Sequence, residues 1–180
     1  MKNTKRLALC SVVSALGVVL LLLGSLVEVL DLTVAMLASI LTVIIVVEVG
    51  GFWPWLTYLV ISAVSLLVLP YKMPAFVFLL SGYYPIVKEK LERLNRVLAW
   101  AIKVVIFNAS LAVGLLAFKL FAPEADLSLI PNLSPTLTYV VLFAVGNVVF
   151  VLYDIALTRI ISFYIYKLRD RFGFIKRRKK

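Results

Sequence analysis

Apolar residues fill six stretches of this chain, separated by short breaks that contain charged residues, glycine or proline. The stretches are Leu7–Val27, Leu32–Val47, Trp55–Leu69, Pro74–Val87, Val97–Phe121 and Pro135–Leu168. A helix that crosses about 30 Å of hydrocarbon needs roughly 20 residues. The first, fifth and sixth stretches reach that length, whereas the other three are short, which favours irregular ends or a thin local bilayer. The pattern predicts an all-α integral membrane protein built as a six-helix transmembrane bundle.

The two ends of the chain are basic and flank this apolar region. Lys2, Lys5 and Arg6 precede the first stretch, which is too long for the apolar part of a signal peptide and has no clear cleavage site after it. We therefore expect a retained span. The sixth stretch is longer than a membrane is wide, so its end should emerge into the cytosol. The prediction is a single six-span membrane domain over residues 1–170 and a basic cytoplasmic tail over 171–180.

Charge between the termini is concentrated at Lys88–Arg96, where six of nine residues are charged. Each Lys, Arg or Asp at the centre of a span costs about 2.5–3.5 kcal/mol, so this segment is expected to lie in water as a topological anchor. If it faces the cytoplasm together with both termini, 17 of the 19 basic residues lie inside, and only Lys72 and Lys119 lie outside. This distribution predicts a multi-pass protein of the cell membrane with both termini cytoplasmic.

Composition supports a membrane protein and argues against several other classes. The chain is 63% hydrophobic, well above the range of soluble domains. Its net charge of +10 follows from the flanking basic segments, so nucleic acid is not an expected partner. The single cysteine, Cys10, excludes an internal disulfide, and the absence of histidine removes the usual zinc sites and Ser-His triads. We expect neither a metal site nor an enzyme.

Small residues recur along the first stretch, L-A-L-C-S-V-V-S-A-L-G. Ala8, Ser11 and Ala15 share one helical face, and small residues at this spacing let membrane helices approach closely. The face would serve either internal packing within the bundle or docking onto another membrane subunit.

The basic start and this first helix resemble the substrate-binding S component of energy-coupling factor (ECF) transporters, as do the chain length and the six predicted spans. Ser11 and Ala15 stand at the positions of the family's Ala-x-x-x-Ala motif, with serine in place of the first alanine. The resemblance implies that Ala8, Ser11 and Ala15 contact a transmembrane coupling subunit. It also implies capture of a vitamin-like solute, with ATP used by partner ATPase subunits and no cofactor in this chain.

The resemblance places a solute pocket at the outer side of the spans. The candidate solute-binding residues are Tyr71, Lys72, Asn108, Lys119, Tyr139 and Asn147. Each has a structural alternative: the two lysines would extend to lipid headgroups, the tyrosines would anchor in the interface, and the asparagines would bond each other or a nearby serine.

Two charged residues lie near the inner boundary of the last two spans. Lys103 and Asp154 are at similar predicted depth, so we expect a structural salt bridge; a proton-coupling role for Asp154 is the alternative. The leading functional hypothesis is solute capture for an ATP-driven uptake transporter. The alternatives are a small structural or assembly protein that packs against a membrane partner without a solute pocket, and a lipid-handling or ion-coupled transporter that works alone.

Overall fold

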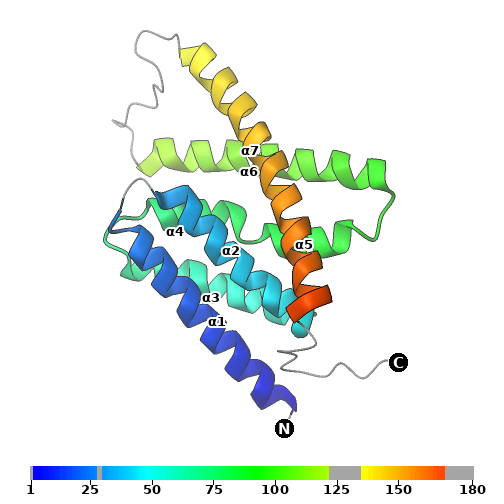
Figure 1. The fold of residues 1–180 in the computed structure, drawn as a ribbon. Helices are drawn as coiled ribbons and strands as arrows, with labels where there is room; N and C mark the ends of the chain where they lie inside the picture. The colour runs from blue at the N-terminus through cyan, green and yellow to red at the C-terminus, as the bar shows by residue number, and fades with distance from the viewer. Residues whose placement is uncertain (1, 28–29, 122–134, 169–180) are drawn as a thin grey trace. The chain divides into compact units, whose positions relative to one another are not determined.

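The computed structural model describes residues 2–27, 30–121 and 135–168, and every regular element in these ranges is helical, which confirms the all-α prediction (Figure 1). The elements are α1 (Lys2–Gly24), α2 (Asp31–Glu48), α3 (Trp53–Val68), α4 (Met73–Ser81), α5 (Tyr84–Leu91), α6 (Arg96–Phe121), α7 (Pro135–Phe163) and the π-helical η2 (Tyr164–Leu168). Four segments are long and apolar enough to cross a membrane: Asn3–Gly24, Asp31–Glu48, Arg96–Ala117 and Thr136–Lys167. The predicted tail, 171–180, lies outside the described residues.

The fourth predicted span is not one helix, and that expectation is wrong. It is divided into α4 and α5, which end and begin on either side of Gly82 and Tyr83. Pro85 explains the break, because its nitrogen carries no hydrogen and its ring would clash with the carbonyl four residues earlier. That carbonyl belongs to Ser81, the last residue of α4. Pro85 instead occupies the first turn of α5, where a missing backbone N–H is tolerated.

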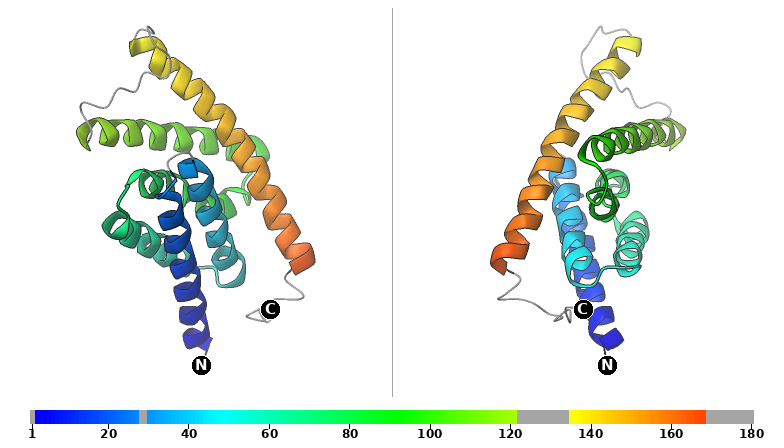
Figure 2. Two further views of the ribbon diagram at one scale, coloured as in Figure 1. Left: turned by 60° about the vertical axis from the view of Figure 1, so that its left-hand side comes forward. Right: turned by 90° about the vertical axis from the view of Figure 1, so that its right-hand side faces the viewer.

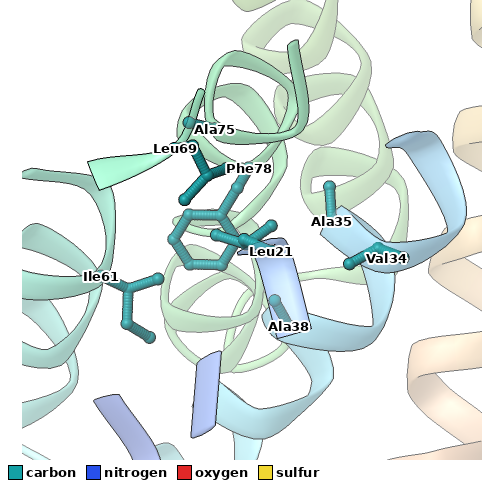
Figure 3. Packing of buried hydrophobic residues seen from close by; sticks show 8 residues of the cluster. All are labelled: Leu21, Val34, Ala35, Ala38, Ile61, Leu69, Ala75 and Phe78. Atoms are coloured by element: carbon teal, nitrogen blue, oxygen red, sulfur yellow. The ribbon is translucent and has the colours of Figure 1, made fainter. Parts of the chain in front are cut away.

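The chain forms two compact units, residues 1–90 with 157–180, and residues 91–156. In the first unit α2 contacts α1, α3 and α4. This explains why nine of its 18 residues are buried, Glu48 among them. Figure 3 shows the core between these helices, where the Phe78 ring of α4 lies beside Leu21 of α1 and close to Ile61 of α3. Ala35 and Ala38 of α2 belong to the same buried cluster, and their small side chains let α2 approach its neighbours closely.

Three glycines of this unit, two in a turn and one within a helix, allow tight geometry. Gly50 and Gly51 have φ of 65° and 69°, the left-handed region that glycine enters at little cost, and they join α2 to α3 in a short turn. At Gly17 of α1, a β-carbon would lie 2.8 Å from the Cδ1 atom of Ile61. The absence of a side chain at Gly17 therefore lets α1 lie directly against α3.

Tyr58 of α3 fastens the end of α4. Its hydroxyl donates to the carbonyl of Leu79 at 2.8 Å, one of the carbonyls that the end of a helix leaves without an intrahelical partner. The Tyr58 ring also packs against Phe78 and Tyr83, with ring centroids 5.9 and 6.4 Å apart. The short helix α4 is thus held by a hydrogen bond as well as by apolar contacts.

The second unit contains α6 and most of α7, which contact each other where they cross and run in opposite senses at the contact (Figure 1). Lys103 contacts Asp154, Phe107 stacks on Phe150 with centroids 4.4 Å apart, and Asn108 bonds Asn147, so numbers rise on one helix as they fall on the other. Both views of Figure 2 show α7 as one unbroken helix. Of the α6 side chains that the structure describes, only Ala99 and Lys103 are buried. An apolar helix this exposed is suited to a hydrocarbon environment.

Candidate functional site

Asn108 and Asn147 form a reciprocal amide pair between α6 and α7. Each Nδ2 donates to the other residue's Oδ1 at 3.0 Å, which confirms the interpretation that the two asparagines bond each other. The second hydrogen of each amide goes to the carbonyl four residues earlier on its own helix, Val104 at 2.9 Å and Phe143 at 2.8 Å. All four N–H donors of the pair are therefore in use.

This saturation bears directly on a role in solute binding. A solute that accepts a hydrogen bond from either amide would first have to displace a bond that the protein already makes, since no N–H donor is left over. The remaining acceptor capacity of each Oδ1 stays available to a solute that donates. The pair as it stands is best suited to fixing the register of α6 against α7.

The other candidate solute-binding residues fall at the ends of helices. Tyr71 and Lys72 lie in the connection from α3 to α4 and are exposed, and the Lys72 ammonium donates to the Leu69 carbonyl. That bond reduces the availability of Lys72 for an anionic solute. Tyr139 is half-buried in the second turn of α7, about 12 Å along the helix from Asn147. Lys119 lies within the bounds of α6, but its side chain falls outside the described part of the structure.

The small-residue face of α1 points away from the core of the first unit. Ala8, Ser11 and Ala15 are all exposed, whereas Cys10 and Ser14, which point in other directions around the helix, are buried. Internal packing within this unit is therefore not what the face does. The Ser11 hydroxyl donates to the Leu7 carbonyl of its own helix at 2.9 Å, which satisfies it without a partner chain. The exposed small side chains at these three positions are suited to close approach by another helix.

Lys103 and Asp154 make the predicted ion pair, and both are buried. Lys103 Nζ lies 3.1 Å from Asp154 Oδ1 and 3.3 Å from Oδ2. The same ammonium lies 3.9 Å from a carboxylate oxygen of Glu92, which is about half exposed, and 5.7 Å from the centroid of the Trp100 ring. Two carboxylates and an aromatic face thus surround one buried cation, an arrangement that offsets the desolvation of the charge.

Two further charged residues, Glu48 and Lys88, are buried, and their burial was not predicted from the sequence. Lys88 has no exposed surface, so the expectation that all of Lys88–Arg96 lies in water is wrong at its first residue; residues 92–96 are exposed as expected. Lys88 Nζ donates to Thr158 Oγ1 at 2.7 Å, and its ammonium lies 5.9 Å from the Tyr84 ring centroid. Glu48 is 2% exposed and accepts from the Tyr164 hydroxyl at 3.3 Å.

One signal in the sequence could have drawn attention to these residues. Glu48 closes an otherwise apolar helix at a turn that contains no basic residue, and Lys88 follows three apolar residues, Pro85, Ile86 and Val87. Ionisable residues at the edges of apolar stretches are often paired in the interior. The identity of their partners, 116 and 70 residues away, depends on tertiary packing.

Comparisons with known proteins add no functional assignment. No family model, curated protein or solved structure matches the chain. Within the described ranges, no three His, Cys, Asp or Glu side chains gather closely enough to hold a metal ion. The exposed faces and the buried polar groups described above are therefore the features that bear on function.

Proposed function

We propose that this chain is a membrane-embedded subunit that captures a small, vitamin-like solute and passes it to partner subunits, a membrane coupling protein with ATPases. The observation that carries the proposal is the exposed small-residue face of α1, Ala8, Ser11 and Ala15. It follows directly after a basic start, as in the S components that the sequence resembles. Small residues exposed on the outside of a bundle let another helix pack closely against it. Contact with lipid does not require small side chains.

The proposal includes a topology of six crossings with both termini in the cytoplasm. The four long apolar segments supply four crossings, α3 with 16 residues supplies the fifth, and α4 and α5 together supply the sixth. A helix of 16 residues is about 24 Å long, which suits a locally thinned bilayer. The asymmetric distribution of lysine and arginine sets the orientation in the cell membrane.

In this proposal the solute is bound at the outer ends of the helices. The candidate contacts predicted from the sequence are Tyr71 and Lys72 in the first unit and Lys119 and Tyr139 in the second, and a lysine in either set would favour a solute that carries a carboxylate or phosphate. Within the second unit, Asn108 and Asn147 would offer their carbonyl oxygens to solute donors. Membrane lipids cover the remaining apolar faces.

A second candidate function is a structural or assembly protein without a solute pocket. The saturation of the Asn108–Asn147 pair favours it, because both amides are already committed to holding α6 against α7. This alternative shares the docking face on α1 with the first proposal. The two therefore differ in solute binding and not in partner binding.

The deciding experiment separates docking from solute capture. The protein would be purified in detergent from its native membrane, tested for associated nucleotide-hydrolysing subunits, and analysed by native mass spectrometry for a retained small molecule. Ala15→Trp should abolish the association. The matched control is Leu16→Trp, which places the same bulk 100° around the helix at a position that is also exposed.

Three results are informative. A retained solute together with association lost only in Ala15→Trp supports the first proposal. Association without any solute, under conditions that preserve bound ligands in a known transporter, favours the assembly role. Equal association in Ala15→Trp and Leu16→Trp would show that the docking face is wrongly assigned.

A further inference from the structure

Two buried charges of the first unit contact the same short C-terminal segment. Lys88, in α5, bonds Thr158 near the end of α7, and Glu48, in the last turn of α2, bonds Tyr164 at the start of η2 (Figure 1). Thr158 and Tyr164 are six residues apart, about 9 Å along the helix. The segment 157–168 therefore bridges the ends of two helices that are far apart in sequence.

The two hydrogen bonds to this segment involve charged groups that are shielded from water. Lys88 has no exposed surface, Glu48 is 2% exposed, and Leu157, the first residue of the segment, is completely buried. A buried charge is tolerated when hydrogen bonds replace its hydration. If the segment moved away, both charges would lose a bond and the apolar contact of Leu157 would be lost with them. Docking of the segment and burial of the two charges are therefore coupled.

The helix is also irregular where it meets Glu48. Residues 164–168 form a π-helical turn, a rare and less stable geometry that often marks functional positions. Tyr164 is its first residue, so the irregular turn begins at the contact with the carboxylate. A segment that joins a regular helix to such a turn is well placed to change conformation.

We propose that segment 157–168 is a strap that closes the ends of α2 and α5, with Lys88–Thr158 and Glu48–Tyr164 as its two polar fastenings. When the strap opens, Glu48 and Lys88 become hydrated and the end of α2 loosens from its neighbours. A role for the strap in opening an inner exit path for the solute rests on the proposed function. The existence of the strap does not, because both fastenings lie within one compact unit.

The single cysteine of the chain provides a native reporter for this movement. Cys10 is buried on α1 and packs against Ile45 of α2 and Val49, the residue that follows Glu48 at the end of α2. Loosening of the end of α2 would expose the thiol to a small, membrane-permeant maleimide. Because the chain has no other cysteine, the labelling rate reports the exposure of Cys10 alone, and comparison between variants isolates the contribution of the segment 157–168.

The test compares conservative variants that each remove one fastening. Tyr164→Phe and Thr158→Val delete a hydroxyl or replace it with a methyl group, and each should raise the labelling rate of Cys10 at least about tenfold, since the lost bond involves a charged group. Ser162→Ala is the matched control. Its hydroxyl lies on the same segment but donates at 2.8 Å to the Thr158 carbonyl of its own helix, so its loss should leave the rate unchanged.

Amide hydrogen exchange over residues 157–168 gives an independent readout that does not use Cys10, and it should accelerate in the same two variants. The strap is refuted if Tyr164→Phe and Thr158→Val label and exchange like Ser162→Ala while circular dichroism shows an intact helical fold. The two variants test different fastenings, so either one suffices if the other does not fold. No solute enters these measurements, so their outcome and the failure of the solute-capture proposal are distinguishable.

Discussion

Lys103 Nζ lies within 3.3 Å of both carboxylate oxygens of Asp154, and the two side chains are each 6% exposed. This contact joins α6 to α7 at positions 51 residues apart. It was predictable because both residues fall at the same depth from the inner end of their apolar stretches. The structure makes it a buried ion pair, with Glu92 as a weaker, half-exposed neighbour at 3.9 Å.

Removal of one partner of this pair should be strongly destabilising. Asp154→Ala leaves the Lys103 ammonium buried without its main counter-ion, and the free energy of unfolding should fall by about 3–5 kcal/mol. Unfolding in mixed detergent micelles, followed by circular dichroism, measures the change. Glu92→Gln is the control and should cost less than about 1 kcal/mol, because its partly solvated charge interacts weakly. Equal effects of the two variants would contradict the assignment.

The Asn108–Asn147 pair should behave as a coupled unit. Asn108→Leu leaves the Asn147 amide without its partner and should cost about 1–2 kcal/mol, the scale of interhelical hydrogen bonds in membranes. Replacing both residues with leucine removes donors and acceptors together and should cost less than the sum of the single changes. A double-mutant cycle in the same unfolding assay measures the difference. Strict additivity would show that the amides do not depend on each other.

Much of the architecture was predictable because helices long and apolar enough to cross a membrane appear in the sequence as continuous apolar stretches. The bounds of α1, α2, α3 and α6 agree with the apolar stretches to within a few residues, except that α1 begins earlier, at Lys2. The fourth stretch misled because its composition is apolar throughout. A backbone effect, the proline ring at position 85, divides it, and hydropathy does not register that effect.

The candidate site was predictable only where both partners could be placed by depth. Lys103 with Asp154, and Asn108 with Asn147, occupy matching levels of the last two spans, so the pairs could be proposed from the sequence. Lys88 could not be paired in this way, because its place after three apolar residues hints at burial but does not identify a partner. Its position follows from packing against a segment 70 residues later in the chain.

The turn between α2 and α3 should tolerate substitution according to backbone conformation alone. A β-carbon at Gly51 would meet no atom within 4 Å, yet φ there is +69°. Gly51→Val should therefore lower the free energy of unfolding by about 1–2 kcal/mol through strain in the left-handed region. Gly51→Asn should cost clearly less, because asparagine enters that region more readily. If the two variants were equally stable, the conformation of the turn would have been wrongly assigned.

The basic residues of the charged stretch should divide into two functional kinds. Neutralising Lys90, Arg93 and Arg96, which are exposed, should disturb membrane orientation with little effect on the stability of the folded protein. Reporter fusions at the C-terminus, active on only one side of the membrane, would show a mixed population. Lys88→Gln should instead leave orientation intact and lower stability, because the buried ammonium that bonds Thr158 is lost.

These two readouts make the division testable within one set of variants. The triple variant should keep the unfolding midpoint of the wild type while its reporter signal splits, and Lys88→Gln should do the reverse. An orientation defect in Lys88→Gln as large as that of the triple variant would mean that Lys88 acts as a topological signal during insertion. An unchanged free energy of unfolding in Lys88→Gln would separately contradict a stabilising role for the bond between Lys88 and Thr158.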